Sequence, residues 1–313
     1  MYSLIPVFCA HDIMSLVRAL PGSAAQGLIW GIMAIGVFLT FKILDFADLT
    51  VDGSFGTGGA VTVMLILAGY SPIVAVGIAF LAGILAGMVT GILHTIFGIP
   101  AILSGILTQI ALYSVNLNIS QGKANQAVSV DMYNLIVTGR NNPATILTVV
   151  IILIMIIALL YWFFGTEIGF TIRATGCNEN MSRAQGINTS IAKVIALAFS
   201  NGLVALAGGI LSQYQGNFDV NMGRGAIVIG LASVIIGEVI GEALLGKHLN
   251  FSGRLAFVAI GSIIYYVVIQ FVLWLGLPTI DMKLFSALVV AVFLAVPYMS
   301  GKSKNSYRKA AKN

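Results

Sequence analysis

Charge is scarce in this chain. Only 9% of its 313 residues are charged, whereas 58% are hydrophobic. About a quarter of the residues of a soluble domain are charged, so this chain has too few charges to cover a water-facing surface. The composition excludes an ordinary soluble protein and predicts an all-α polytopic integral membrane protein, folded as one transmembrane domain over residues 1–313.

Cysteine is scarce as well. Cys9 and Cys177 lie far apart, so neither a disulfide framework nor a cysteine metal site is expected. The N-terminal residues lack a basic stretch before their apolar part, so no cleaved signal peptide is expected. Residues 12–20 instead predict an amphipathic interfacial helix that stops at Pro21 and Gly22, which makes residues 1–21 an N-terminal interfacial segment.

The stretch FADLTVDGSFGTGGAV, residues 46–61, is rich in glycine but lacks the features of a phosphate-binding loop. A Walker loop has the pattern GxxxxGK[ST], in which Lys and a hydroxyl hold phosphates and metal. Neither that Lys nor that spacing is present, and no Ser/His/Asp or Cys/His set occurs elsewhere. The sequence therefore predicts no catalytic residue, no metal site, no cofactor in this chain and no nucleic-acid partner.

Long apolar runs are abundant. A spanning helix needs about 20 mainly apolar residues, and nine runs approach that length: 22–41, 53–69, 72–97, 99–119, 144–164, 191–214, 226–241, 254–277 and 284–299. Two of them, 53–69 and 226–241, are short and rich in glycine. They are expected to be broken helices or half-helices, which occur at membrane depth where protein or a water-filled cavity satisfies their backbone.

The basic tail, residues 300–313, sets the orientation. Cytoplasmic loops carry an excess of Lys and Arg, and this tail holds five: Lys302, Lys304, Arg308, Lys309 and Lys312. With the C-terminus in the cytoplasm, nine spans place the N-terminus outside. The loops alone give nearly equal numbers on the two sides, with Arg224 counted outside.

Several polar residues fall inside or beside the spans. Intramembrane carboxylates are candidates for function, but Thr50 or Asp52 can also cap the helix that follows. Capping is favoured over lining a pathway, and ion coupling is least favoured. Gln109 and Asn116 are seven residues apart and share a face of the fourth span, where they could bond a substrate or, as is favoured, only a neighbouring helix. The residues assigned to a translocation pathway are Asp48, Thr50, Asp52, Ser54, Gln109 and Asn116.

Small residues recur every four positions in the third span, at Ala79, Gly83, Gly87 and Gly91. Such a stripe favours close helix packing. Packing within the chain is favoured over a seam between two copies.

The loop at residues 164–190 predicts a short cytoplasmic helix from Glu179 to Gln185. Asn178 is a good N-cap, and Glu179 and Arg183 stand in the favourable i,i+4 order. Gly186 ends the helix, and Asn188 caps the next one. A short helix between two spans is either a docking element for a moving partner or an amphipathic linker at the lipid surface.

This loop also resembles the coupling region of bacterial ABC importer permeases for branched-chain amino acids and ribose-like sugars. The matching residues are Thr166, Gly169, Arg173, Ala174, Gly176, Asn178, Ala184, Gly186, Ile187 and Asn188. The DLTVDGS segment at 48–54 resembles a segment of the same permeases, and the likeness extends over roughly residues 25–300. It is strongest to a single-gene branch of the family.

The resemblance implies a transport subunit in the cytoplasmic membrane of a bacterium, not an enzyme. Its expected partners are two copies of an ABC ATP-binding subunit, which holds ATP and Mg, an extracellular substrate-binding protein, membrane lipid and a second permease copy, favouring a homodimer. An amino acid is favoured as substrate over a sugar or nucleoside. Residues implied to couple to the ATPase are Asn178, Glu179, Asn180, Met181, Ser182, Arg183, Ala184, Gln185 and Gly186. The alternative is a secondary transporter driven by an ion gradient through Asp48, Asp52 or Glu238.

Overall fold

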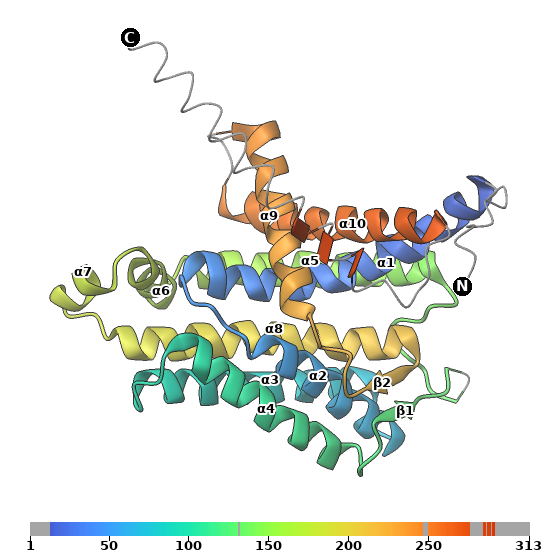
Figure 1. Cartoon of the computed structure of the whole chain (residues 1–313), viewed down its shortest axis with the longest axis horizontal. Helices are drawn as coiled ribbons and strands as arrows, with labels where there is room; N and C mark the ends of the chain where they lie inside the picture. Colours follow the sequence, from blue (N-terminus) through green and yellow to red (C-terminus); the bar gives the residue numbers. More distant parts are fainter. Residues whose placement is uncertain are drawn as a thin grey trace, which may run out of the picture.

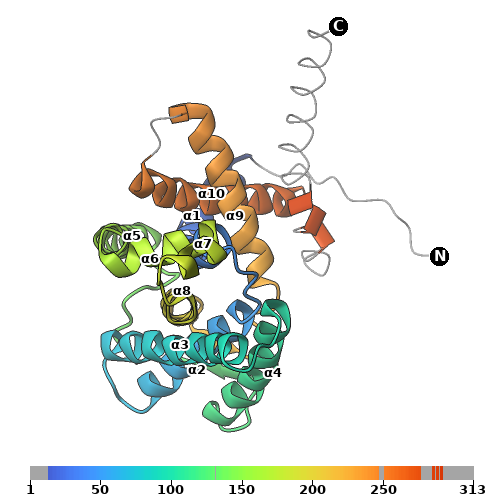
Figure 2. The ribbon, with the colours of Figure 1, turned by 90° about the vertical axis from the view of Figure 1, so that its left-hand side faces the viewer.

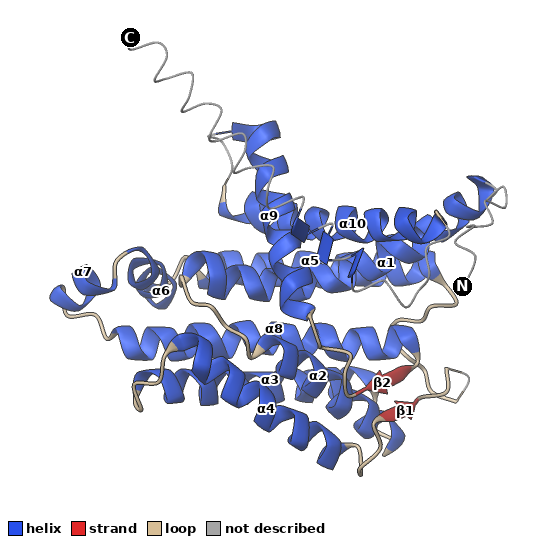
Figure 3. Ribbon diagram, viewed as in Figure 1, coloured by secondary structure: helices blue, strands red, loops and turns tan. Residues whose placement is uncertain are grey.

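The computed structural model describes residues 13–130, 132–246 and 250–275, together with residues 284, 285, 287, 288, 290 and 291. The predicted all-α class is confirmed, since the described chain is almost entirely helical (Figures 1 and 3). Its helices are α1 (Ile13–Phe38), the π-helix η1 (Leu39–Ile43), α2 (Val51–Leu67), α3 (Pro72–Thr95), α4 (Ala101–Ile119), α5 (Asn142–Phe163), α6 (Glu167–Cys177), α7 (Glu179–Ala184), α8 (Thr189–Gln215), α9 (Ala226–Leu245) and α10 (Phe251–Trp274). Two short strands, β1 (Asn125–Ala127) and β2 (Asn217–Asp219), complete it.

Seven helices in the described part of the chain are long and apolar enough to cross a membrane, and α2 is a shorter apolar helix of 17 residues. These eight correspond to the first eight predicted spans. The ninth, 284–299, and the basic tail, 300–313, lie mostly or wholly outside the described residues. Helix α1 runs through Pro21, so the helix end expected at that residue is not found.

The two ends of the bundle differ. Strands β1 and β2 pair antiparallel, with Gln126 opposite Phe218, at the end away from α6 and α7 (Figure 1). Viewed from the α6–α7 end, α8 lies end-on between α3 and α1 (Figure 2). Helix α8 is therefore the central helix, and the polar side chains along its middle, such as Ser200 and Asn201, lie inside protein.

Glycine brings helix backbones into direct contact around α8. A Cβ on Gly83 or Gly87 of α3 would collide with backbone carbonyls of α8. A Cβ on Gly58 of α2 would collide with the backbone carbonyl of Ala205, which also belongs to α8. The stripe of small residues on the third span therefore packs within the chain, as predicted. This close contact explains the glycine content of α2, because an α-carbon without a side chain lets two backbones approach.

The glycine-rich spans were expected to be broken helices or half-helices, and neither is broken in the described chain. Helices α2 and α9 are continuous over 17 and 20 residues. The irregular backbone lies before α2 instead, at residues 44–50, where Asp45 has a φ of 55°. Gly53, in the first turn of α2, packs against Gln109, which lies halfway along α4. Helix α2 thus begins near the middle of the bundle, as a half-helix would.

The outer surface of the bundle is apolar. On α5, the side chains of Ile151 and Ile154 are 58% and 60% exposed. The fully buried side chains include Ile29, Ile32 and Met33 of α1. A chain that is apolar outside as well as inside fits a bilayer, where lipid tails cover the exposed face.

Candidate functional site

A cluster of buried polar side chains, here called the polar cluster, joins the start of α2 to the last part of α3 and to the middle of α4 and α8. It consists of Asp48, Thr50, Ser54, Thr90, Thr108 and Asn201, each at most 3% exposed. The Asp48 carboxylate accepts hydrogen bonds from Thr50 N at 2.9 Å and Asn201 Nδ2 at 2.6 Å. Asn201 Oδ1 accepts from Ser54 Oγ at 2.7 Å. The cluster thus satisfies one N–H group of the irregular backbone before α2, that of Thr50. Backbone groups inside a membrane require such partners.

The hydroxyls of Thr50, Thr90 and Thr108 extend the cluster towards α4. Thr50 Oγ1 lies 2.7 Å from Thr90 Oγ1, which donates to Thr108 Oγ1 at 2.9 Å. Of the predicted pathway residues, Asp48, Thr50 and Ser54 therefore lie within the protein and hold helices together. Thr50 occupies the N-cap position of α2, but its side chain makes no capping hydrogen bond.

Asp52 caps a helix, but not the one that was predicted. Its two carboxylate oxygens accept hydrogen bonds from Gly225 N and Ile227 N, each at 2.9 Å. These N–H groups begin α9, so a residue of the first turn of α2 caps α9. The Asp52 carboxylate also lies at the N-terminus of α9, where the positive end of the helix dipole favours a negative charge. The starts of α2 and α9 consequently meet at Asp52.

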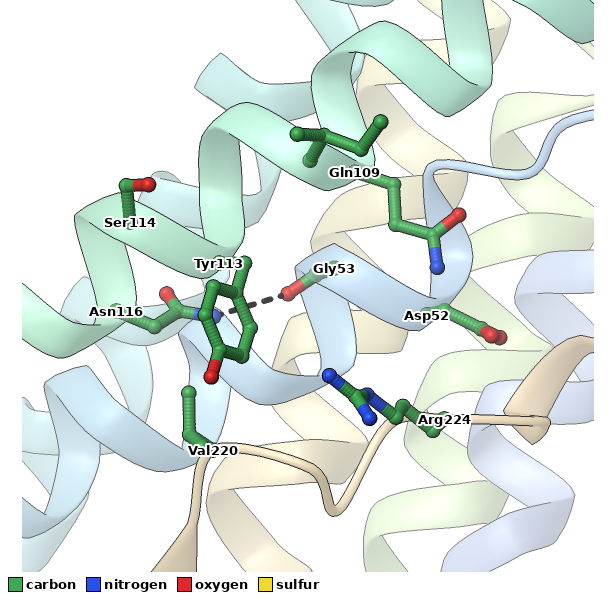
Figure 4. Close-up of a pocket in the computed structure, with 9 residues that line it drawn as sticks. Asp52, Gly53, Gln109, Tyr113, Ser114, Asn116, Val220 and Arg224 are labelled. Carbon is green, nitrogen blue, oxygen red and sulfur yellow. Dashed lines mark hydrogen bonds between the residues drawn. The ribbon is translucent and has the colours of Figure 1, made fainter. Parts of the chain in front are cut away.

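A cavity of about 210 Å³ opens beside this meeting point (Figure 4). Its polar walls come from α2, α4 and the loop before α9, and they comprise Asp52, Gln109, Tyr113, Ser114, Asn116 and Arg224. We call it the polar cavity. Three predicted pathway residues, Asp52, Gln109 and Asn116, meet there, although α2 and α4 are separated by α3 in the chain.

Two residues of the polar cavity were not predicted from the sequence. Arg224 stacks over the Tyr113 ring, with 5.6 Å between the guanidinium carbon and the ring centroid. Arg224 was counted as an outer-loop residue, yet it lies beside Gln109, halfway along α4. In the sequence, only the flanking glycines, Gly223 and Gly225, distinguish Arg224 from an ordinary loop residue.

Glu238, an alternative ion-coupling residue, is held in ion pairs. Its carboxylate lies 2.7 Å from Lys42 Nζ and 3.6 Å from Arg254 Nη1. The side chain is only 12% exposed. These pairs connect η1, α9 and α10, which gives Glu238 a structural role. Lys247, a partner considered for it, is outside the described residues.

At the other end of the molecule, the short helix α7 has the geometry that its sequence predicts. Asn178 Oδ1 accepts from Met181 N at 3.0 Å and caps α7. Gly186 follows the helix with a φ of 83°. Asn188 Oδ1 accepts from Ile191 N at 3.1 Å and caps α8. Local capping rules thus account for this part of the loop.

The rest of the loop motif packs α6 against its surroundings. Thr166 caps α6, and a Cβ on Gly169 would collide with Phe164. The Arg173 guanidinium lies over the rings of Phe164 and Phe251, at 5.2 and 4.5 Å. A Cβ on Gly176 would collide with the carbonyl that ends η1. The motif therefore specifies how the loop is fixed to the bundle.

Glu179 fastens α7 to α8. Lys193 Nζ donates to both carboxylate oxygens at 2.8 Å, and Arg183 Nη2 donates to one at 2.6 Å. Lys193 also lies 3.4 Å from His94 Nε2, at the end of α3. Most of α7 remains accessible, including Met181, which is 59% exposed. Ser182 is buried and donates to Asn178 O, so it does not belong to the exposed face.

The link between Glu179 and Lys193 predicts a pH-dependent contribution to stability. The hydrogen bond from Lys193 and the positive charges of Lys193 and Arg183 lower the pKa of the Glu179 carboxyl. A group with a lowered folded pKa stabilises the fold above its unfolded pKa, about 4.3 for glutamate, and this stabilisation is lost at lower pH. We expect wild-type protein to unfold at a higher temperature than Glu179→Gln at pH 7, with the difference shrinking below about pH 4.3.

Thermal unfolding of detergent-purified protein across this pH range measures the effect. Glu167→Gln is the matched control, because Glu167 is an exposed carboxylate in the first turn of α6. A difference between wild type and Glu179→Gln that is the same at pH 7 and pH 3.5 would contradict the prediction.

Comparison with known proteins shows the family of the chain. The profile of the family described as "Branched-chain amino acid transport system / permease component" matches residues 20–297. The chain belongs to this permease family. No solved structure matches the permease.

Three relatives indicate the range of the family. The permease is 39% identical to the tyrosine transport system permease protein of Clostridioides difficile, over 91% of its own length and 93% of that protein. It is 28% identical to the autoinducer 2 import system permease protein LsrC of Escherichia coli, over 72% and 63% of the two chains. It is 26% identical to the ribose import permease protein RbsC of Escherichia coli, over 74% and 71%. The permease is thus a multi-pass membrane subunit of an ABC importer, and its relatives differ in what they carry.

Proposed function

We propose that this permease imports an amino acid across the cytoplasmic membrane of a bacterium, using ATP hydrolysis by a separate subunit. The observation that carries the proposal is α7, an accessible helix held to the central helix α8 by the Glu179–Lys193 ion pair. A helix fixed in this way can transmit the movement of a docked partner to the helix bundle. The substrate class follows the tyrosine transport system permease protein of Clostridioides difficile, to which the permease is 39% identical.

The assembly we propose contains two copies of the permease, two ATP-binding subunits that hold ATP and Mg, and an extracellular substrate-binding protein. Each ATP-binding subunit docks on α7 and the residues beside it, 178–186. In this arrangement α6 and α7 face the cytoplasm, the side on which the basic tail was predicted, and β1 and β2 lie on the side of the substrate-binding protein. Substrate crosses beside Asp52, Gln109 and Asn116, which line the polar cavity.

Charge reversal at Glu179 tests the docking assignment. Glu179→Lys removes both ion pairs of the carboxylate and places a third cation beside Lys193 and Arg183. In proteoliposomes that contain the permease with its ATP-binding and substrate-binding partners, we expect ATP-driven uptake to fall at least tenfold. Hydrolysis of ATP should continue without stimulation by the loaded binding protein.

Glu167→Lys is the matched control, since it reverses an exposed acidic charge on the neighbouring helix α6. We expect this variant to keep both uptake and stimulated hydrolysis. Normal uptake with normal stimulation in Glu179→Lys would contradict the docking assignment. Uptake that persists without ATP under an imposed ion gradient would instead favour a secondary transporter.

A further inference from the structure

Arg224 is an unusual residue for its position. It lines the polar cavity next to Gln109 and Tyr113, halfway along the spanning helix α4. Within the described part of the chain, no carboxylate lies at ion-pair distance from its guanidinium, and its recorded partner is the Tyr113 ring. A cation at membrane depth is costly and usually pairs with an anion or faces an aqueous pathway.

The cavity wall near Arg224 offers the opposite charge and amide groups. The oxygens of Asp52 accept hydrogen bonds from backbone N–H groups at the start of α9, among them those of Gly225 and Ile227. A carboxylate has about four acceptor sites, so these bonds do not exhaust it. Asn116 is 2% exposed, and its Oδ1 has no hydrogen-bond partner among the described residues. Gln109 adds a second amide beside Asp52 (Figure 4). A cation and a carboxylate therefore lie at the wall of one small space, with the side chains of Gln109 and Asn116 beside them.

These groups distinguish between classes of ligand. A neutral sugar would leave the charge of Arg224 without a partner, and a simple amine would be repelled by it. A simple carboxylic acid would satisfy Arg224 but would lie close to the like charge of Asp52. A zwitterion satisfies both, because its carboxylate can form a bidentate pair with the guanidinium while its ammonium group donates to Asp52 and the amides.

We infer that the polar cavity receives the zwitterionic head group of an α-amino acid, with Arg224 binding the carboxylate and Asp52 binding the ammonium group. The inference rests on the proposed import of an amino acid and adds the residues that select it. Tyr113 orients the guanidinium by stacking against it.

A second cavity has room for the side chain of the amino acid. It has a volume of about 370 Å³, and Arg224 lines it as well. Its other walls include Trp30, Tyr265 and Tyr266. An amino acid whose carboxylate is held at Arg224 can place an apolar or aromatic side chain against these rings.

Substitution of Arg224 in the reconstituted transporter tests the inference. Arg224→Gln removes the charge and keeps a polar side chain, and Arg224→Lys keeps the charge but loses the bidentate geometry. With L-tyrosine as the probe, we expect at least tenfold lower uptake in Arg224→Gln and an intermediate loss in Arg224→Lys. Hydrolysis of ATP stimulated by the binding protein should stay at the wild-type rate in both variants.

Two comparisons separate substrate recognition from a structural role. Lys123→Gln removes a positive charge from the turn between α4 and β1 and should leave uptake unchanged, since Lys123 does not line the polar cavity. Tyrosinamide lacks the carboxylate, so the preference of the transporter for tyrosine over tyrosinamide should shrink in Arg224→Gln. The binding protein is the same in every assay, so a changed preference belongs to the permease.

Wild-type uptake of tyrosine by Arg224→Gln would overturn the inference, as would an equal loss of uptake and of stimulated hydrolysis. Either result leaves the proposed import of amino acids intact if the wild-type complex carries tyrosine. A wild-type complex that carries ribose but no amino acid would instead refute the proposed function.

Discussion

Gly58→Ala should prevent the permease from reaching its native stability. The added Cβ would collide with the backbone carbonyl of Ala205, at the contact of α2 with α8. Backbone cannot move aside as the end of a side chain can, so two buried helices must separate. Overpacking of this kind costs up to about 3 kcal/mol. We expect a large fall in the thermal unfolding temperature in detergent and a low yield of folded protein.

Gly77→Ala is the control for this substitution. Gly77 also lies within a spanning helix, α3, but a Cβ there meets no atom within 4 Å. Alanine is favoured over glycine in helices by about 1 kcal/mol, so Gly77→Ala should be neutral or slightly stabilising. Equal stability of the two variants would show that the backbone contact of α2 with α8 is not needed.

Asn201→Ala should cause the second large loss of stability. The Asn201 side chain donates to Asp48 at 2.6 Å and accepts from Ser54 at 2.7 Å, and all three residues are buried. Alanine leaves the Ser54 hydroxyl without its acceptor and removes the amide donor of the Asp48 carboxylate, which then has donors from Thr50 alone. An unsatisfied buried polar group costs about 1–3 kcal/mol, so we expect a loss of about 3 kcal/mol in SDS or thermal unfolding.

Asn118→Ala provides the comparison, because Asn118 is an exposed asparagine whose amide donates only to Ser114 O, one turn earlier in α4. Its replacement should change stability by less than about 0.5 kcal/mol. If Asn201→Ala costs no more than this, the polar cluster does not hold α2 against α8.

The features that could be predicted from the sequence depend on neighbours in the chain. Asn178, Gly186 and Asn188 each act on backbone groups within four residues, so the bounds of α7 could be predicted to within one residue. The spanning helices were also predictable, because about 20 apolar residues in a row identify each of them locally.

The features that could not be predicted join distant parts of the chain. Asp52 was recognised as a cap, but its partner is Gly225, 173 positions away. Arg224 follows a short strand and reads as a loop residue, and only the folded chain places it beside Gln109. The glycines of α2 suggested a break, whereas their role depends on Ala205 of α8, which no local pattern identifies.

The glycine contacts also determine which helices can shift relative to one another. Helices that meet through side chains can slide by small shear movements as rotamers adjust. The backbones of α2 and α3 rest directly on α8 at Gly58, Gly83 and Gly87 and leave no such deformable layer. We therefore expect these three helices to move as one rigid body. A rocking motion of this body relative to α9 would strain the hydrogen bonds from Gly225 N and Ile227 N to Asp52.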